Sequence, residues 1–296
     1  MRPESHEAVV VIEPFDLGAT MAQQVLGHFD PTGSRSAGAF RKVHLTADGR
    51  PVAWHFTRTA NGFRVRVYGT ATADVLTDFL ACFPLADGCD GFDPRHPILR
   101  RVVQLYGGLR LLRVPWAFDV AAGAVLQQRV RWQVAYSDFR RLANRWGTPA
   151  WGAMAFPTAG QLAGLPVAAI EAQGVDPKRA RALHALARRE TVRPFLTAET
   201  DPTRLRLRLR QLRGIGPWTA NMIAGYAAGD PDAVPTGDLH LPSLVTSALA
   251  GEAEGTDDRM LELLEPYRGL RFRVVRLLSW AARRAPQVLV QRTRGR

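Results

Sequence analysis

A turn built on two glycines constrains the fold of this chain more than any other feature. It reads Leu212-Arg-Gly214-Ile215-Gly216-Pro217-Trp218 and lies between two stretches with helical spacing. Glycine reaches backbone angles that are closed to other residues, so the chain can reverse tightly and approach a partner closely. Proline costs little at the first helical position, and the amides at a helix start suit a phosphate. The sequence therefore predicts a helical hairpin that binds a nucleic-acid backbone.

Asp238 lies about twenty residues beyond the turn, in Val234-Pro-Thr-Gly-Asp238-Leu239. Aspartate commonly caps a helix, and a helix here would begin at Leu239. Taken by itself, Asp238 is best explained as such a cap.

Charge points to a polyanionic partner. The 296 residues carry a formal net charge of +12, with a sequence pI of about 10.9. All but two of the 39 Lys and Arg residues are arginines, a bias that a GC-rich genome also produces. Four arginines are candidates for phosphate contacts, although each alone is better explained as a solvated charge: Arg131, Arg179, Arg181 and Arg213. The chain shows no apolar leader and no spanning run, which predicts a cytoplasmic, nucleoid-associated protein.

The Gly-Ile-Gly-Pro-Trp turn and its downstream aspartate resemble the helix-hairpin-helix DNA glycosylases of the HhH-GPD superfamily, above all the alkylation-response, 3-methyladenine glycosylase II type. The resemblance is strong over about residues 200–240 and weaker over 115–130 and 264–280. It implies a monomeric base excision repair enzyme that binds damaged double-stranded DNA. Such an enzyme flips out an alkylated purine, 3-methyladenine or 7-methylguanine, and hydrolyses its bond to the sugar. An abasic site remains, and Asp238 is the catalytic residue.

The resemblance also implies a monofunctional reaction. Relatives that cut the strand use a hairpin lysine, but Pro217-Trp218 stands there in this chain, and Lys42 and Lys178 lie elsewhere. The two cysteines, Cys82 and Cys89, are too few for the iron–sulfur cluster of related branches. No cofactor is therefore expected for catalysis.

Further positions take roles through this resemblance alone. DNA contacts fall on Gly214, Ile215, Gly216, Thr219, Gln128 and Arg129. The base pocket, whose aromatic rings would attract a cationic purine, falls on Trp218, Tyr267, Met222 and Phe118. Family hairpins also hold Na⁺ or K⁺, here through the backbone carbonyls of Arg210, Leu212 and Ile215. For the segment 124–130, which carries Gln128 and Arg129, an ordinary amphipathic helix is an equal interpretation.

Two departures from the family pattern leave the lesion range open. Met222 stands where the alkylation glycosylase has a pocket tyrosine, and His240 stands where many relatives have glycine. Histidine at such a place is more often a surface or capping residue than a catalytic one. Two alternatives therefore remain: a glycosylase for oxidised or deaminated bases, and a DNA-damage-binding protein without turnover.

The element pattern predicts two domains of different class. Residues 1–112 read as an α+β domain, which by resemblance is a TATA-binding-protein-like antiparallel sheet with two helices. Its strands are expected near 8–12, 40–45, 52–57 and 63–68, its helices at 17–29 and 72–83, with hairpin turns at Asp48-Gly49 and Asn61-Gly62. Residues 113–290 read as an all-α helix-hairpin-helix glycosylase domain, followed by a basic, disordered tail at 291–296.

Several helices of the second domain are predicted from spacing. Residues 118–144 suggest one long helix or two short ones, and further helices span 177–189 and 270–284. Residues 205–210 alternate as a strand would. We nevertheless predict a helix there, because Asp201-Pro202 is a strong helix start and the glycine turn ends the segment.

Overall fold

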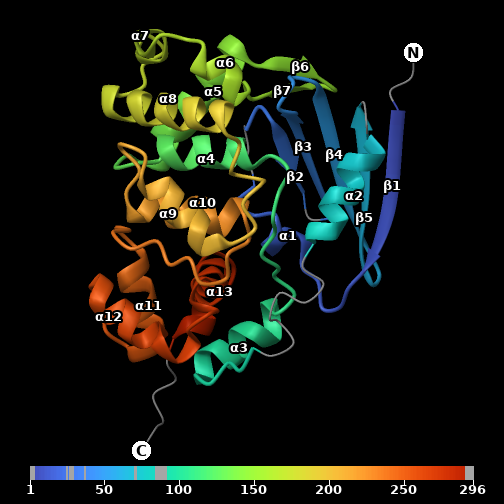
Figure 1. The fold of residues 1–296 in the computed structure, drawn as a ribbon. Coiled ribbons are helices and arrows are strands. Elements are labelled where there is room, and N and C mark those ends of the chain that lie inside the picture. Colours follow the sequence, from blue (N-terminus) through green and yellow to red (C-terminus); the bar gives the residue numbers. More distant parts are fainter. Residues whose placement is uncertain are drawn as a thin grey trace, which may run out of the picture.

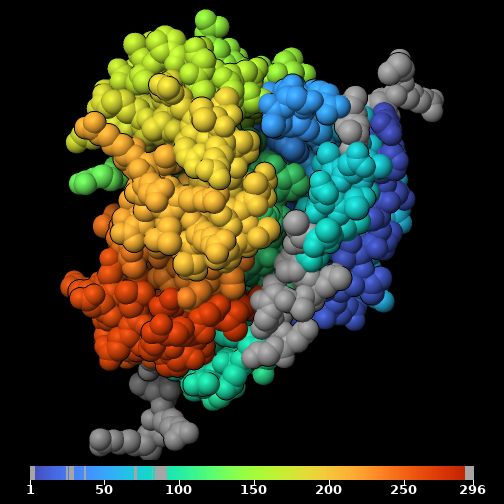
Figure 2. Space-filling view, viewed as in Figure 1, coloured from blue at the N-terminus to red at the C-terminus, as the bar shows by residue number. Residues whose placement is uncertain are grey.

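The computed structural model describes residues 4–24, 26, 30–36, 38–69, 72–83 and 92–290. An antiparallel sheet forms one side of the molecule, and a stack of helices forms the other (Figure 1). The predicted tail at 291–296 lies outside the described residues, as does Cys89. In the space-filling view the helical part and the sheet part lie against each other (Figure 2).

The sheet contains five strands in the order β1-β5-β4-β3-β2. The strands are β1 (Glu4–Val11), β2 (Gly33–Arg35), β3 (Ala39–Leu45), β4 (Pro51–Thr59) and β5 (Gly62–Gly69). Both predicted hairpins form: β3 pairs with β4 and β4 pairs with β5, all antiparallel. Gly49 in the first turn has φ +83°, a conformation that favours glycine. The short strand β2 was not predicted; it pairs with β3, Gly33 opposite Lys42.

The first helix is shorter than its spacing predicts. Among the described residues of the segment 17–29, the helix is α1 (Leu17–Thr20), and the chain turns at Met21. Gln24 then bonds to two distant groups: it accepts from Trp116 Nε1 at 2.9 Å and donates to the Tyr226 carbonyl at 3.0 Å. These two hydrogen bonds to distant residues hold Gln24 outside the helix. Residues 25 and 27–29 lie outside the described residues.

The core of the sheet continues into the helical part. Phe40, Trp54, Phe56 and Phe63 are buried beneath α2 (Thr72–Cys82), together with Trp116. The Trp54 and Trp116 rings meet edge to face with centroids 5.8 Å apart. Likewise α3 (Pro97–Tyr106), which the predicted boundary assigns to the first domain, packs against the distant α13 (Arg271–Arg284) (Figure 1).

The helical part follows the predicted pattern closely. The segment 118–144 is two helices, α4 (Ala117–Leu126) and α5 (Trp132–Trp146). The remaining elements, in chain order, are β6 (Thr148–Ala150), β7 (Ala153–Ala155), α6 (Ala159–Ala163), α7 (Val167–Glu171), α8 (Pro177–Val192), α9 (Pro202–Arg210), α10 (Pro217–Ala227), α11 (Leu241–Ala250), α12 (Asp257–Leu264), η1 (Glu265–Tyr267), α13 and η2 (Pro286–Leu289). The small β6–β7 hairpin was not predicted.

The alternating segment 205–210 is helical, as predicted. The Asp201 carboxylate accepts hydrogen bonds from the Thr203 and Arg204 amides at 2.8 and 3.3 Å, which starts α9. Leu205 and Leu209, four residues apart, share the buried face. Within the described ranges, no helix is both long and apolar enough to span a bilayer.

Candidate DNA-binding and catalytic site

The glycine turn joins α9 to α10 as a hairpin. Gly214 has φ +88°, and a Cβ added there would lie 2.8 Å from the Ala182 Cβ of α8. Gly216 caps α10 in an extended conformation and has open space around it. No side chain caps the first amides of α10, and Gly214 and Gly216 are exposed, while Ile215 is buried below them. The hairpin therefore presents unpaired backbone donors to solvent.

Gln128 fastens the turn between α4 and α5 to this hairpin. Its Nε2 donates to the Gly214 carbonyl and to Thr219 Oγ1, both at 2.8 Å. The next residue, Arg129, is exposed and has φ +55°, which is strained for a residue with a Cβ. The contact puts Gln128 and Arg129 on the same surface as the hairpin.

An exposed tryptophan at the start of α5 was missed in the sequence. Trp132 is 63% exposed, whereas most large aromatic residues of the chain are buried. It follows the exposed Arg131 and lies four residues after Gln128. The available signal was its place directly after Arg131 and three residues after Arg129, although a tryptophan is more often buried than exposed.

The carboxylate of Asp238 is held from two helices. Oδ2 accepts from Trp218 Nε1 at 2.8 Å, and Oδ1 accepts from the amides of His240 and Leu241 at 2.9 and 3.0 Å. The capping role is therefore present, because α11 begins at Leu241. The His240 side chain is exposed and caps nothing. One oxygen of Asp238 orders α11, and the other lies beside the hairpin tryptophan.

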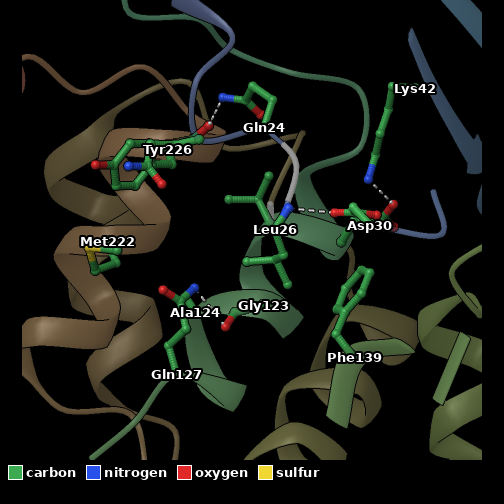
Figure 3. A pocket seen from close by; sticks show the side chains of 13 residues that line it. Gln24, Leu26, Asp30, Lys42, Gly123, Ala124, Gln127, Phe139, Met222 and Tyr226 are labelled. Atoms are coloured by element: carbon green, nitrogen blue, oxygen red, sulfur yellow. Dashed lines mark hydrogen bonds and ion pairs between the residues drawn. The ribbon is translucent and has the colours of Figure 1, made fainter. Parts of the chain in front are cut away.

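A cavity lies one helical turn along α10 from Trp218. Met222 and Tyr226 of α10 face Gly123 and Ala124 of α4, and Gln127 directly after it, across the cavity (Figure 3). The other side is formed by residues of the sheet domain and α5, among them Gln23, Gln24, Leu26, Asp30, Lys42 and Phe139. Met222 therefore lines a cavity, and its role in base binding stays a prediction.

A buried ion pair closes the sheet side of the cavity. Lys42 Nζ lies 2.9 Å from Asp119 Oδ2 and donates to Thr32 Oγ1 at 2.6 Å. Burial raises the pKa of Asp119, and the Lys42 charge opposes that shift. One of the two lysines of the chain thus has a structural partner at the cavity wall.

Three of the four pocket candidates do not line this cavity: Trp218, Phe118 and Tyr267. Phe118 packs against Phe156, with ring centroids 6.4 Å apart, and contributes to the core. Tyr267 is buried in a second core, where its hydroxyl accepts from the His96 amide at 3.2 Å and its pKa is raised by burial. Neither residue is among those that form the cavity wall, because packing turns both rings into the cores.

The arginine candidates differ in their surroundings. Arg179 is buried, where it pairs with Asp138 at 2.6 Å and donates to the Leu126 carbonyl at 2.8 Å, so it is a structural residue. Arg181 is exposed and lies 3.7 Å from Glu171. Arg131 and Arg213 are exposed near the hairpin.

Comparison with known proteins identifies the helical part. Residues 122–268 match the family described as "HhH-GPD superfamily base excision DNA repair protein". This chain contains an HhH-GPD domain. The Mycobacterium tuberculosis "probable bifunctional transcriptional activator/DNA repair enzyme AlkA" is 36% identical over 151 residues, which cover 49% of this chain and 30% of that protein. The Bacillus subtilis "DNA-3-methyladenine glycosylase" is 25% identical over 186 residues, which cover 58% and 59%.

This chain thus spans less than two thirds of the length of these curated relatives. Two solved structures share its fold. A 3-methyladenine DNA glycosylase from Archaeoglobus fulgidus has a TM-score of 0.70 at 22% identity, covering 94% of this chain and 98% of that one. An 8-oxoguanine glycosylase/lyase from Clostridium acetobutylicum has a TM-score of 0.62 at 15% identity, covering 85% and 97%. The predicted fold class, a sheet domain before an HhH-GPD domain, is confirmed.

Proposed function

We propose that this protein is a monofunctional DNA glycosylase that removes alkylated purines, such as 3-methyladenine and 7-methylguanine, and leaves an abasic site. The observation that carries the proposal is the Asp238 carboxylate, held by the indole of Trp218 in the first turn of α10, next to an open helical hairpin. The name of the B. subtilis relative, a DNA-3-methyladenine glycosylase, supports this activity, and the name of the M. tuberculosis relative supports a role in DNA repair.

The proposed DNA-binding face combines the hairpin with the adjoining turn. The α10 amides after Gly216 would bind a phosphate of double-stranded DNA, as the positive end of a helix does. Arg129, Arg131 and Trp132 adjoin them through the contact between Gln128 and Gly214. An exposed indole offers a stacking surface for an unstacked base. In this proposal one monomer suffices, and the cytoplasmic, nucleoid-associated location stays a prediction.

Asp238 would act on the sugar once the base is flipped out. As the base leaves, positive charge develops on the deoxyribose, and a carboxylate held in place stabilises it without reorganisation. The same group orients the attacking water. A lysine nucleophile is not needed for this reaction, and Lys42 is engaged with Asp119 and Thr32. Met222 and Tyr226, on the same helix as Trp218, line a cavity of about 30 Å³, so this wall would have to open to take a purine.

The monovalent cation that the family resemblance implies is also part of this proposal. Arg210 is the last residue of α9, so its carbonyl has no helical partner. The Leu212 carbonyl accepts only the Ile215 amide at 3.0 Å among the turn bonds, and Ile215 is anchored by burial. Neutral carbonyl oxygens suit Na⁺ or K⁺. The test compares DNA affinity in Na⁺, in K⁺ and in a large organic cation at matched ionic strength. Equal affinity in all three would contradict the cation proposal.

The decisive experiment uses Asp238→Asn on methylated DNA, with the freed bases identified by chromatography. The variant keeps the oxygen that caps α11, so it should bind DNA as the unaltered protein does and release no base. Loss of both activities, or of neither, contradicts the assigned role. The matched control is Asp257→Asn, whose carboxylate accepts the Gly237 amide at 2.7 Å and has no proposed part in the chemistry.

A second candidate, removal of oxidised or deaminated bases, is favoured by Met222, which puts a flexible thioether in the cavity wall. Duplexes with single defined lesions separate the candidates. Release of hypoxanthine or 8-oxoguanine without any methylated purine would replace the first proposal. Tight lesion binding with no release over long incubation would favour a non-catalytic damage-binding protein.

A further inference from the structure

Four arginine side chains gather where β2 meets α13. This arginine cluster consists of Arg35, Arg276, Arg283 and Arg284. The guanidinium carbons of Arg35 and Arg284 lie 5.8 and 4.9 Å from the ring centroid of Trp280. That of Arg276 lies 4.9 Å from the ring of Tyr226. Two aromatic rings thus hold guanidinium groups from both parts of the chain close together.

The positive charge of the arginine cluster is not compensated. Among the residues that the structure describes, no carboxylate lies within ion-pair distance of any of the four. Burial lowers the pKa of Arg35 and of Arg283, and the neighbouring guanidinium groups lower it further. Arginine nevertheless stays charged. Holding like charges together is unfavourable, so a bound anion would stabilise this arrangement.

Two donors of the arginine cluster are buried and unused. Arg35 Nη1 and Arg276 Nε have no hydrogen-bond partner. Other contacts fix the side chains: Arg276 Nη2 donates to the Ala19 carbonyl at 3.0 Å. Arg283 donates to the Gln23 side-chain oxygen at 2.7 and 3.0 Å, in the amide orientation that satisfies both groups. Unpaired buried donors are costly, and the planar fork of arginine matches phosphate oxygens.

The arginine cluster borders the candidate site. Gln23 and Tyr226, which contact it, also form part of the cavity wall. Tyr226 lies eight residues after Trp218 on α10, which is about 12 Å along the helix axis. A DNA strand advances about 3.4 Å per nucleotide. Along α10, the ring that Arg276 contacts is therefore displaced from the tryptophan that holds Asp238 by roughly the length of three or four nucleotides.

We propose that the arginine cluster binds a phosphate of the lesion-bearing DNA strand, separately from the hairpin. Through Arg35 of β2, the sheet domain then takes a direct part in DNA binding. This inference rests on the proposed function only in that DNA is the ligand. It assigns no chemistry to the arginines, and Asp238 plays no part in its test.

The test measures binding of a duplex with an abasic-site analogue across a range of salt concentrations. The variants are Arg35→Gln and Arg284→Gln, singly and combined; Arg276 is left intact because it also supports α1. Each lost phosphate contact should lower the slope of log K against log salt by about 0.9. We expect the affinity to fall about tenfold at low salt for the double variant. Arg58→Gln, an exposed arginine on β4, is the charge-matched control.

Three results would overturn the proposal. One is a double variant whose slope and affinity equal those of Arg58→Gln. Another is thermal stabilisation by inorganic phosphate that requires Arg35 and Arg284 while DNA binding is unchanged, since the site then takes a free anion. The third is a change in which base is released with no change in salt slope, since the arginines then contact the base. A protein that binds DNA through this cluster but excises nothing would contradict only the proposed function.

Discussion

The indole Nε1 of Trp218 donates a hydrogen bond to Oδ2 of Asp238 across 2.8 Å, while Oδ1 accepts the two amides at the start of α11. Three donors therefore converge on one half-buried carboxylate. Because they come from two different helices, the direction of the carboxylate depends on how α10 packs beside α11. The tryptophan of the hairpin thus has a positioning role that is separate from any contact of its ring with a base.

Replacing Trp218 by phenylalanine tests this positioning. Trp218→Phe keeps an aromatic ring and removes the donor to Asp238. We expect the single-turnover rate of base release to fall about tenfold, the worth of one hydrogen bond to a charged group, with DNA affinity nearly unchanged. Rapid-quench measurement on a defined lesion duplex gives the rate. An unchanged rate, or a loss confined to affinity, would show that the ring alone matters.

The two hairpin glycines should differ in their effect on stability. Gly214→Ala places a Cβ 2.8 Å from that of Ala182 and in a left-handed conformation, so it should cost about 1–2 kcal/mol or more. Gly216→Ala has free space and a negative φ, so the free energy of unfolding should change by less than about 0.5 kcal/mol. Urea denaturation of both variants measures the difference. Equal costs would contradict the assigned turn geometry.

Trp132 offers a test of the proposed DNA-binding face. Because its side chain is 63% exposed, Trp132→Ala should leave the unfolding free energy within about 0.5 kcal/mol of the original. Affinity for duplex DNA with an abasic-site analogue should fall by about 1–3 kcal/mol if the indole stacks on a base. Val192→Ala, an exposed apolar residue at the end of α8, serves as control. Equal affinity of the two variants would place Trp132 outside the interface.

His44 should make the stability of the protein depend on pH. The ring is buried beside Trp54, and burial lowers its pKa to about 4 from an ordinary 6.5. The unfolded chain therefore binds a proton that the folded chain excludes between these values. The contribution of His44 is complete above pH 6.5 and is lost as the pH falls toward 4, at up to about 1.4 kcal/mol per unit. Below that pKa the loss levels off.

The comparison of His44→Phe with the original protein isolates this effect from other groups. Denaturant unfolding at pH 7, 6, 5 and 4.5 should give a shallower pH dependence for the variant over that interval. Asp119, whose pKa is raised, acts with the opposite sign in both proteins and cancels in the difference. Parallel curves for the two proteins would mean that His44 is protonated equally in both states.

Much of this fold could be predicted from the sequence, because helix caps and turns depend on residues that are close together in the chain. Asp201 with Pro202 started α9 in spite of an alternating pattern, and Asp48-Gly49 closed the β3–β4 hairpin. Gly214 and Gly216 marked the turn, and Asp238 lay at the start of the next helix. In each case the deciding interactions join residues a few positions apart, so a local pattern carries them.

Partners across the fold were decided by packing alone. Nothing in the sequence distinguishes Arg179 from the other arginines. In the structure its buried side chain donates to Asp138, forty-one positions away. Tyr267 enters a core against the segment before α3 instead of a base pocket. These outcomes depend on which faces of distant helices meet, and no spacing in the sequence encodes that.

By itself, then, the sequence determined a helical hairpin with two glycines, an aspartate in reach of a helix start and a basic chain without a hairpin lysine. Only the tertiary structure brought Trp218 to Asp238, tied Gln128 to Gly214 and gathered Arg35 with Arg284 around Trp280. The physical reason is the range of the interactions. Backbone conformation and capping act between neighbours in sequence, whereas the site and its charges form where separately folded elements pack together.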